Sequence, residues 1–283
     1  MTGRNIKLFF RDKSTVFFSL LSVLIIIALY ALFLGDTYKN GLENVKGIDF
    51  LINSWVIAGI LAVVSVTATM GAFGAMVEDR SKKILKDFYA TPVKRSEIAG
   101  GYILSAFTVG VLMSLITLLL GEIYIFIAGG ELLGLSAAAG LLGLIVLSVL
   151  SSSAMVFFIV TFFKSQNAFA TASTIIGTLI GFLTGVYIPI GSLPEWVQLI
   201  IKLFPLSHAG ALIRQLLLKQ PMAVSFAGAP EAAVEKFNHS MGVVLQFNRS
   251  DVDPMTSVIV LLVTTVLFYG LAVLNVSRKI KIS

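Results

Sequence analysis

The chain has 283 residues, of which 57% are hydrophobic and only 13% are charged, and its mean hydropathy is +0.95. Soluble domains are roughly 45–50% apolar, and here runs of about 20 apolar residues recur along the chain, which excludes a soluble globular fold. The net charge of +6 does not indicate a nucleic-acid partner, because the Lys and Arg of multi-span proteins gather on the cytoplasmic side.

Six apolar runs are predicted as transmembrane helices. They cover residues 16–34, 51–77, 102–128, 132–163, 169–190 and 255–276. A bilayer core about 30 Å thick requires about 20 residues of helix, and these runs meet or exceed that length. The sequence therefore predicts an all-α integral membrane protein with a single transmembrane domain over residues 1–283.

The segment before the first run, residues 1–15, mixes apolar and basic side chains. Ile6 and Phe9 alternate there with Lys7 and Arg11. This pattern is typical of a short helix that lies in the membrane interface, with its apolar side toward the lipid. The alternative is a basic flank that only orients the first span.

The loop charges predict the orientation of the chain. With the N-terminus inside, the inner segments hold about twice as many Lys and Arg residues as the outer ones. We therefore expect both termini to be cytoplasmic and the protein to lie in the cell (plasma) membrane.

Residues 78–90, between the second and third spans, are predicted to form an amphipathic cytoplasmic helix. Its apolar side consists of Ile84, Leu85, Phe88 and Tyr89. A solvated basic loop does not need these side chains. Pro92 disfavours helical geometry at the residue before it, so the helix is expected to end there. A short helix held outside the membrane by two long spans can bind another protein.

The outer segment, residues 191–254, is the largest part outside the predicted spans. Its first half contains short apolar stretches around Trp196, interrupted by Pro194 and Pro205 and preceded by Pro189. These stretches are too short to cross the bilayer, so we expect re-entrant or interfacial helices. The second half is more polar and is predicted to include a mobile connection.

Three glycines in the fifth run, Gly177, Gly181 and Gly185, have a small-xxx-small spacing. On one helical face they would let another helix approach closely. Packing within the chain is one interpretation, and a subunit interface or a wall of an export path is the other.

Three polar residues within apolar runs are candidates for a substrate path: Glu122, Thr174 and Thr178. A carboxylate inside a membrane often marks function, although Glu122 lies near the outer end of its run, where headgroup exposure is the alternative. Threonine hydroxyls commonly bond to a carbonyl one turn back, so they do not by themselves indicate a pore.

No catalytic residue and no metal site are assigned. The sequence has no cysteine and two histidines, and it lacks G-x-x-x-x-G-K-[ST], H-E-x-x-H and G-x-S-x-G motifs. Without a P-loop we expect no nucleotide to bind here, so the energy for transport must come from a partner or a gradient.

The order of these elements resembles the permease subunits of type-2 ABC exporters, the class that includes drug and antibiotic-resistance exporters. The resemblance rests on "TPVKRSEI" (91–98) on the inner side and the proline and tryptophan run 189–205 on the outer side. It covers essentially the whole chain.

The resemblance implies an export role for the chain. ATP and Mg²⁺ would be bound by a separate ABC ATPase subunit, and a second permease copy would form a homo- or heterodimer in the lipid membrane. Residues 78–90 would be the coupling helix, whose charged contacts come from Glu78, Asp79, Arg80 and Lys83. The substrate would be a drug, a peptide or a lipid-like molecule.

Two other functions fit parts of the pattern. An ion-coupled secondary transporter should carry paired charges or broken helices near the bilayer midplane. A non-transporting membrane scaffold or immunity protein should lack an ATPase partner.

Overall fold

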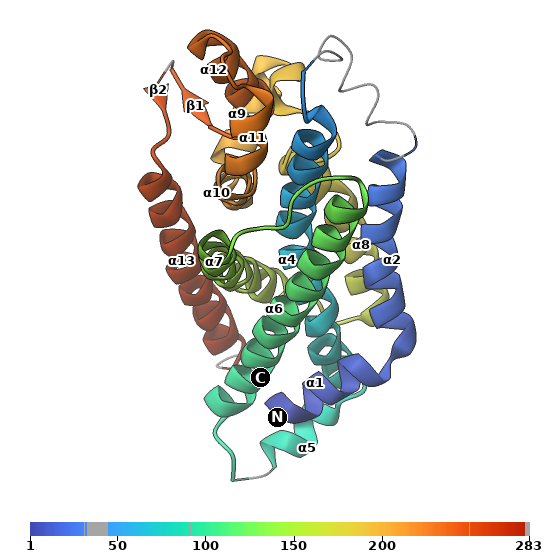
Figure 1. Ribbon diagram of the computed structural model, residues 1–283. Coiled ribbons are helices and arrows are strands. Elements are labelled where there is room, and N and C mark those ends of the chain that lie inside the picture. Colours follow the sequence, from blue (N-terminus) through green and yellow to red (C-terminus); the bar gives the residue numbers. More distant parts are fainter. Residues whose placement is uncertain (31, 33–44, 91, 249, 281–283) are drawn as a thin grey trace.

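The computed structural model describes residues 1–30, 32, 45–90, 92–248 and 250–280, and these residues form a bundle of helices (Figure 1). The four longest helices are α4 (Ile48–Ser81), α6 (Arg95–Ile127), α7 (Leu135–Val160) and α13 (Pro254–Ile280). Shorter helices in the bundle are α2 (Lys13–Leu29) and α8 (Gln166–Leu183). The helical fold predicted from the sequence is confirmed, apart from one small hairpin.

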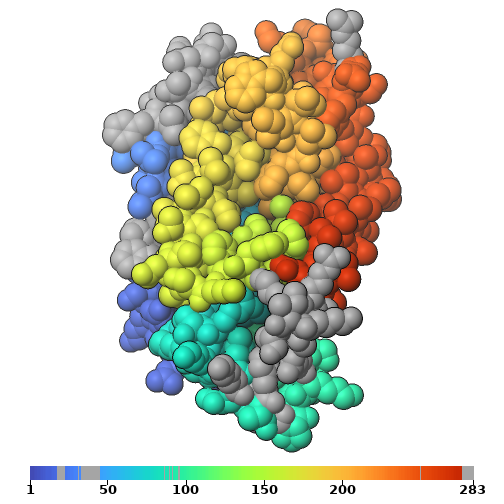
Figure 2. All heavy atoms as spheres, turned by 180° about the vertical axis from the view of Figure 1, so that it is seen from behind, coloured from blue at the N-terminus to red at the C-terminus, as the bar shows by residue number. Residues whose placement is uncertain are grey.

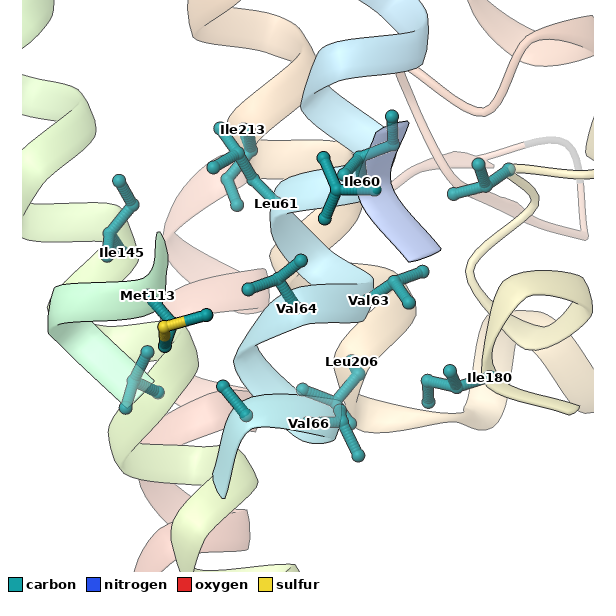
Figure 3. Close-up of a cluster of buried hydrophobic side chains, with 14 of the residues drawn as sticks. Ile60, Leu61, Val63, Val64, Val66, Met113, Ile145, Ile180, Leu206 and Ile213 are labelled. Atoms are coloured by element: carbon teal, nitrogen blue, oxygen red, sulfur yellow. The ribbon is translucent and has the colours of Figure 1, made fainter. Parts of the chain in front are cut away.

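Helix α4 forms the centre of the bundle. Of its most apolar 18 residues 89% are buried, against 28–56% for the other three long helices. A helix that is apolar on all sides must be covered on all sides. Figure 3 shows side chains of α4, from Ile60 to Val66, meeting Met113 of α6, Ile145 of α7 and Ile180 of α8.

The structure confirms membrane-spanning helices but not all six predicted spans, and residues 31, 33 and 34 of the first predicted span lie outside the described residues. In the part of the chain that the structure describes, four helices are long and apolar enough to cross a membrane, or five if the bent pair α9 and α10 counts as one. The first and fifth predicted runs correspond to α2, with 17 residues, and to α8, with 18, which begins with the polar Gln166 and Asn167.

Several helix boundaries in the structure also differ from the predicted ones. The second and third spans are longer than predicted, because α4 continues to Ser81 and α6 begins at Arg95. The fifth is shorter, since α8 ends at Leu183. Residues 1–15 are not one helix: α1 (Thr2–Arg11) ends before Asp12, whose carboxylate accepts hydrogen bonds from the first amides of α2.

The two ends of the bundle differ, as Figure 1 shows. Helix α1, the short α5 (Ile84–Tyr89) and the C-terminal end of α13 lie together at one end, called here the basal end. The segment from η2 (Ile190–Ser192) to β2 (Ser250–Asp251) covers the opposite end and is called the cap. Both described ends of the chain therefore lie on the same side of the bundle.

The cap is more ordered than predicted. Its helices are α9 (Glu195–Leu203), α10 (Pro205–Leu217), α11 (Lys219–Ser225) and α12 (Glu231–Ser240). They are followed by an antiparallel pair of two-residue strands, β1 (Gln246–Phe247) and β2. The predicted interruption by prolines is confirmed: Pro194 caps α9, Pro205 opens α10, and the two helices meet at 87°.

We expect Gly110→Val to destabilise the bundle. A Cβ at Gly110 would lie 2.7 Å from Val149 and 2.8 Å from Thr69, where α6, α7 and α4 meet. Overpacking of this kind costs about 1–3 kcal/mol and should lower the unfolding midpoint in detergent by several degrees. Gly143→Val is the control, because a Cβ there meets no atom within 4 Å. Equal midpoints for both variants would contradict the packing.

Candidate functional site

The predicted coupling segment 78–90 is not a single helix. Helix α4 continues through Glu78, Asp79 and Arg80, and α5 starts at Ile84 after a short break. Lys83 in this break has a φ of 63°, a left-handed conformation that is uncommon outside glycine. The charged start of the segment thus belongs to a long bundle helix, and only α5 is a separate basal helix.

The buried carboxylate of Asp79 binds α1 to the basal end of α4. Arg4 donates to it through both terminal nitrogens, at 2.6 and 2.9 Å, and the hydroxyl of Tyr102 on α6 donates to the same carboxylate. Asp79 is 3% exposed, so its charge requires these donors. The hydrogen bond to Asp79 raises the pKa of the Arg4 guanidinium above its ordinary value.

Arg80 is also engaged inside the chain. Its Nη1 donates to the carbonyl of Phe163 at 2.7 Å, just past the C-terminus of α7, where carbonyls lack helical partners. Asp79 and Arg80 are predicted docking contacts for a partner, and the structure shows both side chains engaged inside this chain, Asp79 buried and Arg80 half-buried. The sequence shows their charge but does not show that α4 continues past the apolar run.

The apolar side of α5 faces this chain. Leu85 is 8% exposed, Ile84 and Phe88 are half-buried, and the side chain of Tyr89 lies outside the described residues. The guanidinium of Arg4 lies 5.3 Å from the ring centre of Phe88, within cation–π range. The surface that α5 and the preceding turn leave exposed includes the charged residues Glu78, Lys82, Lys83 and Asp87.

A groove-like cavity of about 1040 Å³ opens beside this network. It is lined by α1, the start of α2, the basal half of α4 and α8. Along α4 it extends from Glu78 to Val66, which is about 18 Å at 1.5 Å per residue. Its charged members Arg4, Asp12, Glu78 and Asp79 lie toward the basal end, and the rest is lined by apolar side chains and glycines together with serines, threonines and Gln166.

Only some of the residues that were candidates for a substrate path lie together in the structure. Thr174 and Gly177 line the cavity, whereas Thr178 and Glu122 do not. Both threonine hydroxyls donate to carbonyls four residues back. Glu122 accepts a hydrogen bond of 2.8 Å from the amide of Leu133 and so holds the connection between α6 and α7. The structure thus gives Glu122 a structural partner away from the cavity.

The three glycines do not share one helical face. A Cβ at Gly177 would meet nothing within 4 Å, and one at Gly181 would lie 2.2 Å from the ring of Tyr187 in the same chain. Gly185 follows the end of α8 and has a φ of 66°. The common stripe is therefore a wrong prediction: Gly181 packs within the chain, and Gly185 makes a turn.

Arg214 of α10 is a buried residue that the sequence reasoning counted only as a loop charge. It is 1% exposed, and its Nη2 donates to the carbonyls of Thr184 and Gly185 at 2.9 and 3.1 Å, while Nη1 donates to Gly242. Its guanidinium lies 5.0 Å from the ring centre of Trp55. Its position in an apolar stretch of the sequence, "ALIRQLLL", was a signal for this role.

We expect Arg4→Gln to lower the free energy of unfolding by about 1–3 kcal/mol, because it leaves the buried Asp79 carboxylate without its cation. Arg4 is 35% exposed, so the lower half of that range applies. Adding Asp79→Asn should recover part of the loss, which a double-mutant cycle in detergent measures. Lys7→Gln on the same helix is the control and should change little. Additive losses for Arg4 and Asp79 would contradict the coupling.

Comparison with known proteins agrees with the architecture. Curated protein sequences give no match to the chain. The family described as ABC-2 family transporter protein matches residues 39–274, from before α4 to the last turns of α13. This match covers most of the sequence, including the four longest helices, α5, α8 and the cap, and it leaves out α1 and α2. The chain is therefore a multi-pass membrane protein that belongs to the ABC-2 transporter family.

Proposed function

We propose that the chain is the membrane-spanning permease subunit of an ATP-driven exporter, whose ATPase is a separate chain that docks at the basal end. The single observation that carries this proposal is the placement of α5. It lies outside the long helices at their basal end, and Arg4 connects it to Asp79 at the end of α4. A displacement of α5 would thus be transmitted through Arg4 to α4, the central helix of the bundle.

In this proposal the basal end is cytoplasmic and both termini are inside the cell. ATP and Mg²⁺ would be bound by the ATPase subunit, which would contact the exposed charges Glu78, Lys82, Lys83 and Asp87. The buried Asp79 and Leu85, together with the half-buried Arg80, would transmit the motion within this chain.

The cavity supports a path for an amphipathic substrate, such as a drug, a peptide or a lipid-like molecule. Apolar side chains such as Met70 and Phe169 line it together with hydroxyls of Thr67 and Ser173. Helix α8 forms one wall, and Figure 2 shows its outer side uncovered on this face of the chain. Ile175 and Leu179 there are 54% and 50% exposed. A second permease copy packed against α8 would close the groove into a conduit.

An ion-coupled transporter would need a buried carboxylate that is free to bind the coupling ion. Asp79 is the buried carboxylate in the part of the chain that the structure describes, and it is held by Arg4 and Tyr102. Arg4 lies 2.6 Å from it, so the carboxylate already has a charged partner inside the chain. This engagement supports the ATP-driven proposal over ion coupling.

We expect the double change Lys83→Glu and Asp87→Lys to weaken the association with the ATPase at least tenfold, because it reverses exposed charges where α5 would dock. The ATPase that copurifies with the wild-type chain from native membranes provides the measurement, together with ATP-dependent export from inverted vesicles. Lys219→Glu and Glu231→Lys in the cap form the matched control. Failure of the wild-type chain to copurify with any ATPase would contradict the proposal.

Filling the cavity should separate transport from docking. We expect Gly177→Phe to fold normally, because a Cβ at Gly177 meets open space, and to block at least 90% of export while the ATPase remains bound. Gly143→Phe, on the exposed side of α7, is the control and should export normally. Normal export by the Gly177 variant would exclude the cavity as the path.

A further inference from the structure

The cap contains a second cavity, of about 280 Å³, which none of the proposed transport steps uses. Its walls come from α9, α12 and the segments next to η2 and β1. The polar side chains that line it include Gln198 and Lys202 of α9, Lys236 and His239 of α12, and Gln246 of β1. Segments far apart in the sequence thus bring these donors together.

The charge of this cavity is positive. Its lining includes no carboxylate. Among the described residues, neither Lys202, which is half-buried, nor Lys236, which is exposed, makes an ion pair. The adjacent Asp251 lies outside the lining and accepts hydrogen bonds from His239 at 2.8 Å and Gln246 at 3.1 Å. The two ammonium groups therefore have no carboxylate to compensate them, and they favour an anion.

The location of α9 indicates where that anion comes from. Trp196, Leu199, Ile200 and Leu203 leave one side of α9 apolar and 50–68% exposed. A short helix with an apolar, tryptophan-bearing side and a basic side is typical of the membrane interface. Gln198 and Lys202 lie on the side that lines the cavity. The cavity thus lies beside a helix whose composition suits the level of the lipid headgroups.

We propose that the cap cavity binds the phosphate of an anionic lipid headgroup in the leaflet on the cap side. The ammonium groups of Lys202 and Lys236 neutralise the phosphate. The amide nitrogens of Gln198 and Gln246 already donate one hydrogen bond each, to the carbonyl of Leu193 and to Asp251, and their second N–H groups donate to the phosphate oxygens or to the headgroup alcohol. The acyl chains lie along the exposed apolar side of α9. Such a lipid fixes the depth of α9 and, through it, the position of the cap.

The test compares lipid binding by the full chain in nanodiscs that contain equal amounts of phosphatidylglycerol and phosphatidylcholine. Native mass spectrometry then counts the lipids that remain bound after release from the disc. We expect the wild-type chain to retain one phosphatidylglycerol with roughly tenfold preference, and Lys202→Gln with Lys236→Gln to lose that preference. The control is Lys46→Gln with Lys219→Gln, two exposed lysines at the same end of the bundle that do not line the cavity.

A second arm identifies the source of the anion. Inorganic phosphate is added at millimolar concentration to the chain in neutral detergent, and the unfolding midpoint is measured with and without it. No change, together with a rise on adding short-chain phosphatidylglycerol, supports the lipid. A rise with phosphate alone that the lysine variant abolishes supports the anion site but assigns it to a free anion. Equal retention of phosphatidylglycerol by the wild-type chain and the Lys202 and Lys236 variant would overturn the proposal.

Discussion

The complete burial of α4 is the constraint on which the rest of the structure depends. Its interior turns carry apolar or small side chains on every side, so α2, α6, α7, α8 and α10 must cover it. Trp55 and Phe73 are fully buried among these neighbours. A helix covered in this way tolerates charge only near its ends, and the buried acid Asp79 lies two residues before its C-terminus, at Ser81.

This placement of charge gives the basal end two layers with different tasks. The inner layer, formed by Arg4, Asp79 and Tyr102, joins three helices through a desolvated carboxylate whose bonds are strong and directional. The outer layer, Lys82, Lys83 and Asp87, remains in solvent, where charges steer association and contribute little to stability. A surface suited to a partner therefore lies directly over a network that holds the bundle together.

Hydropathy alone located the helices but not their ends or their burial. The apolar run 51–77 predicted α4, whereas the hydropathy of the charged residues after it did not show that α4 continues for four more positions, nor that the helix breaks at Lys83. The small-xxx-small spacing placed Gly185 on a helix, because spacing cannot show that α8 ends at Leu183. Helix ends depend on capping and tertiary contacts that one sequence reveals only weakly.

The candidate site was likewise predicted only in part from the sequence. The sequence predicted an amphipathic element over 78–90, of which α5 is the separate part, and it proposed Thr174 for a substrate path and Gly177 for helix packing or a path wall, and both line the cavity. It could not show that Leu85 faces inward or that Glu122 holds a loop, since both depend on which neighbours are present. The pairing of Arg4 with Asp79, 75 residues apart, is a tertiary fact with no local signal.

The buried Arg214 has a consequence for the order in which the protein assembles during synthesis. Two of its carbonyl acceptors, on Thr184 and Gly185, precede it by about 30 residues, but the third, on Gly242, follows it by 28. A guanidinium cannot leave water until its acceptors exist, because an unpaired charge in an apolar site is costly. The Arg214 guanidinium on α10 must therefore remain hydrated until Gly242 has been synthesised and has left the ribosome. The cap therefore closes only after the residues up to Gly242 have been made, and α13 is inserted after it.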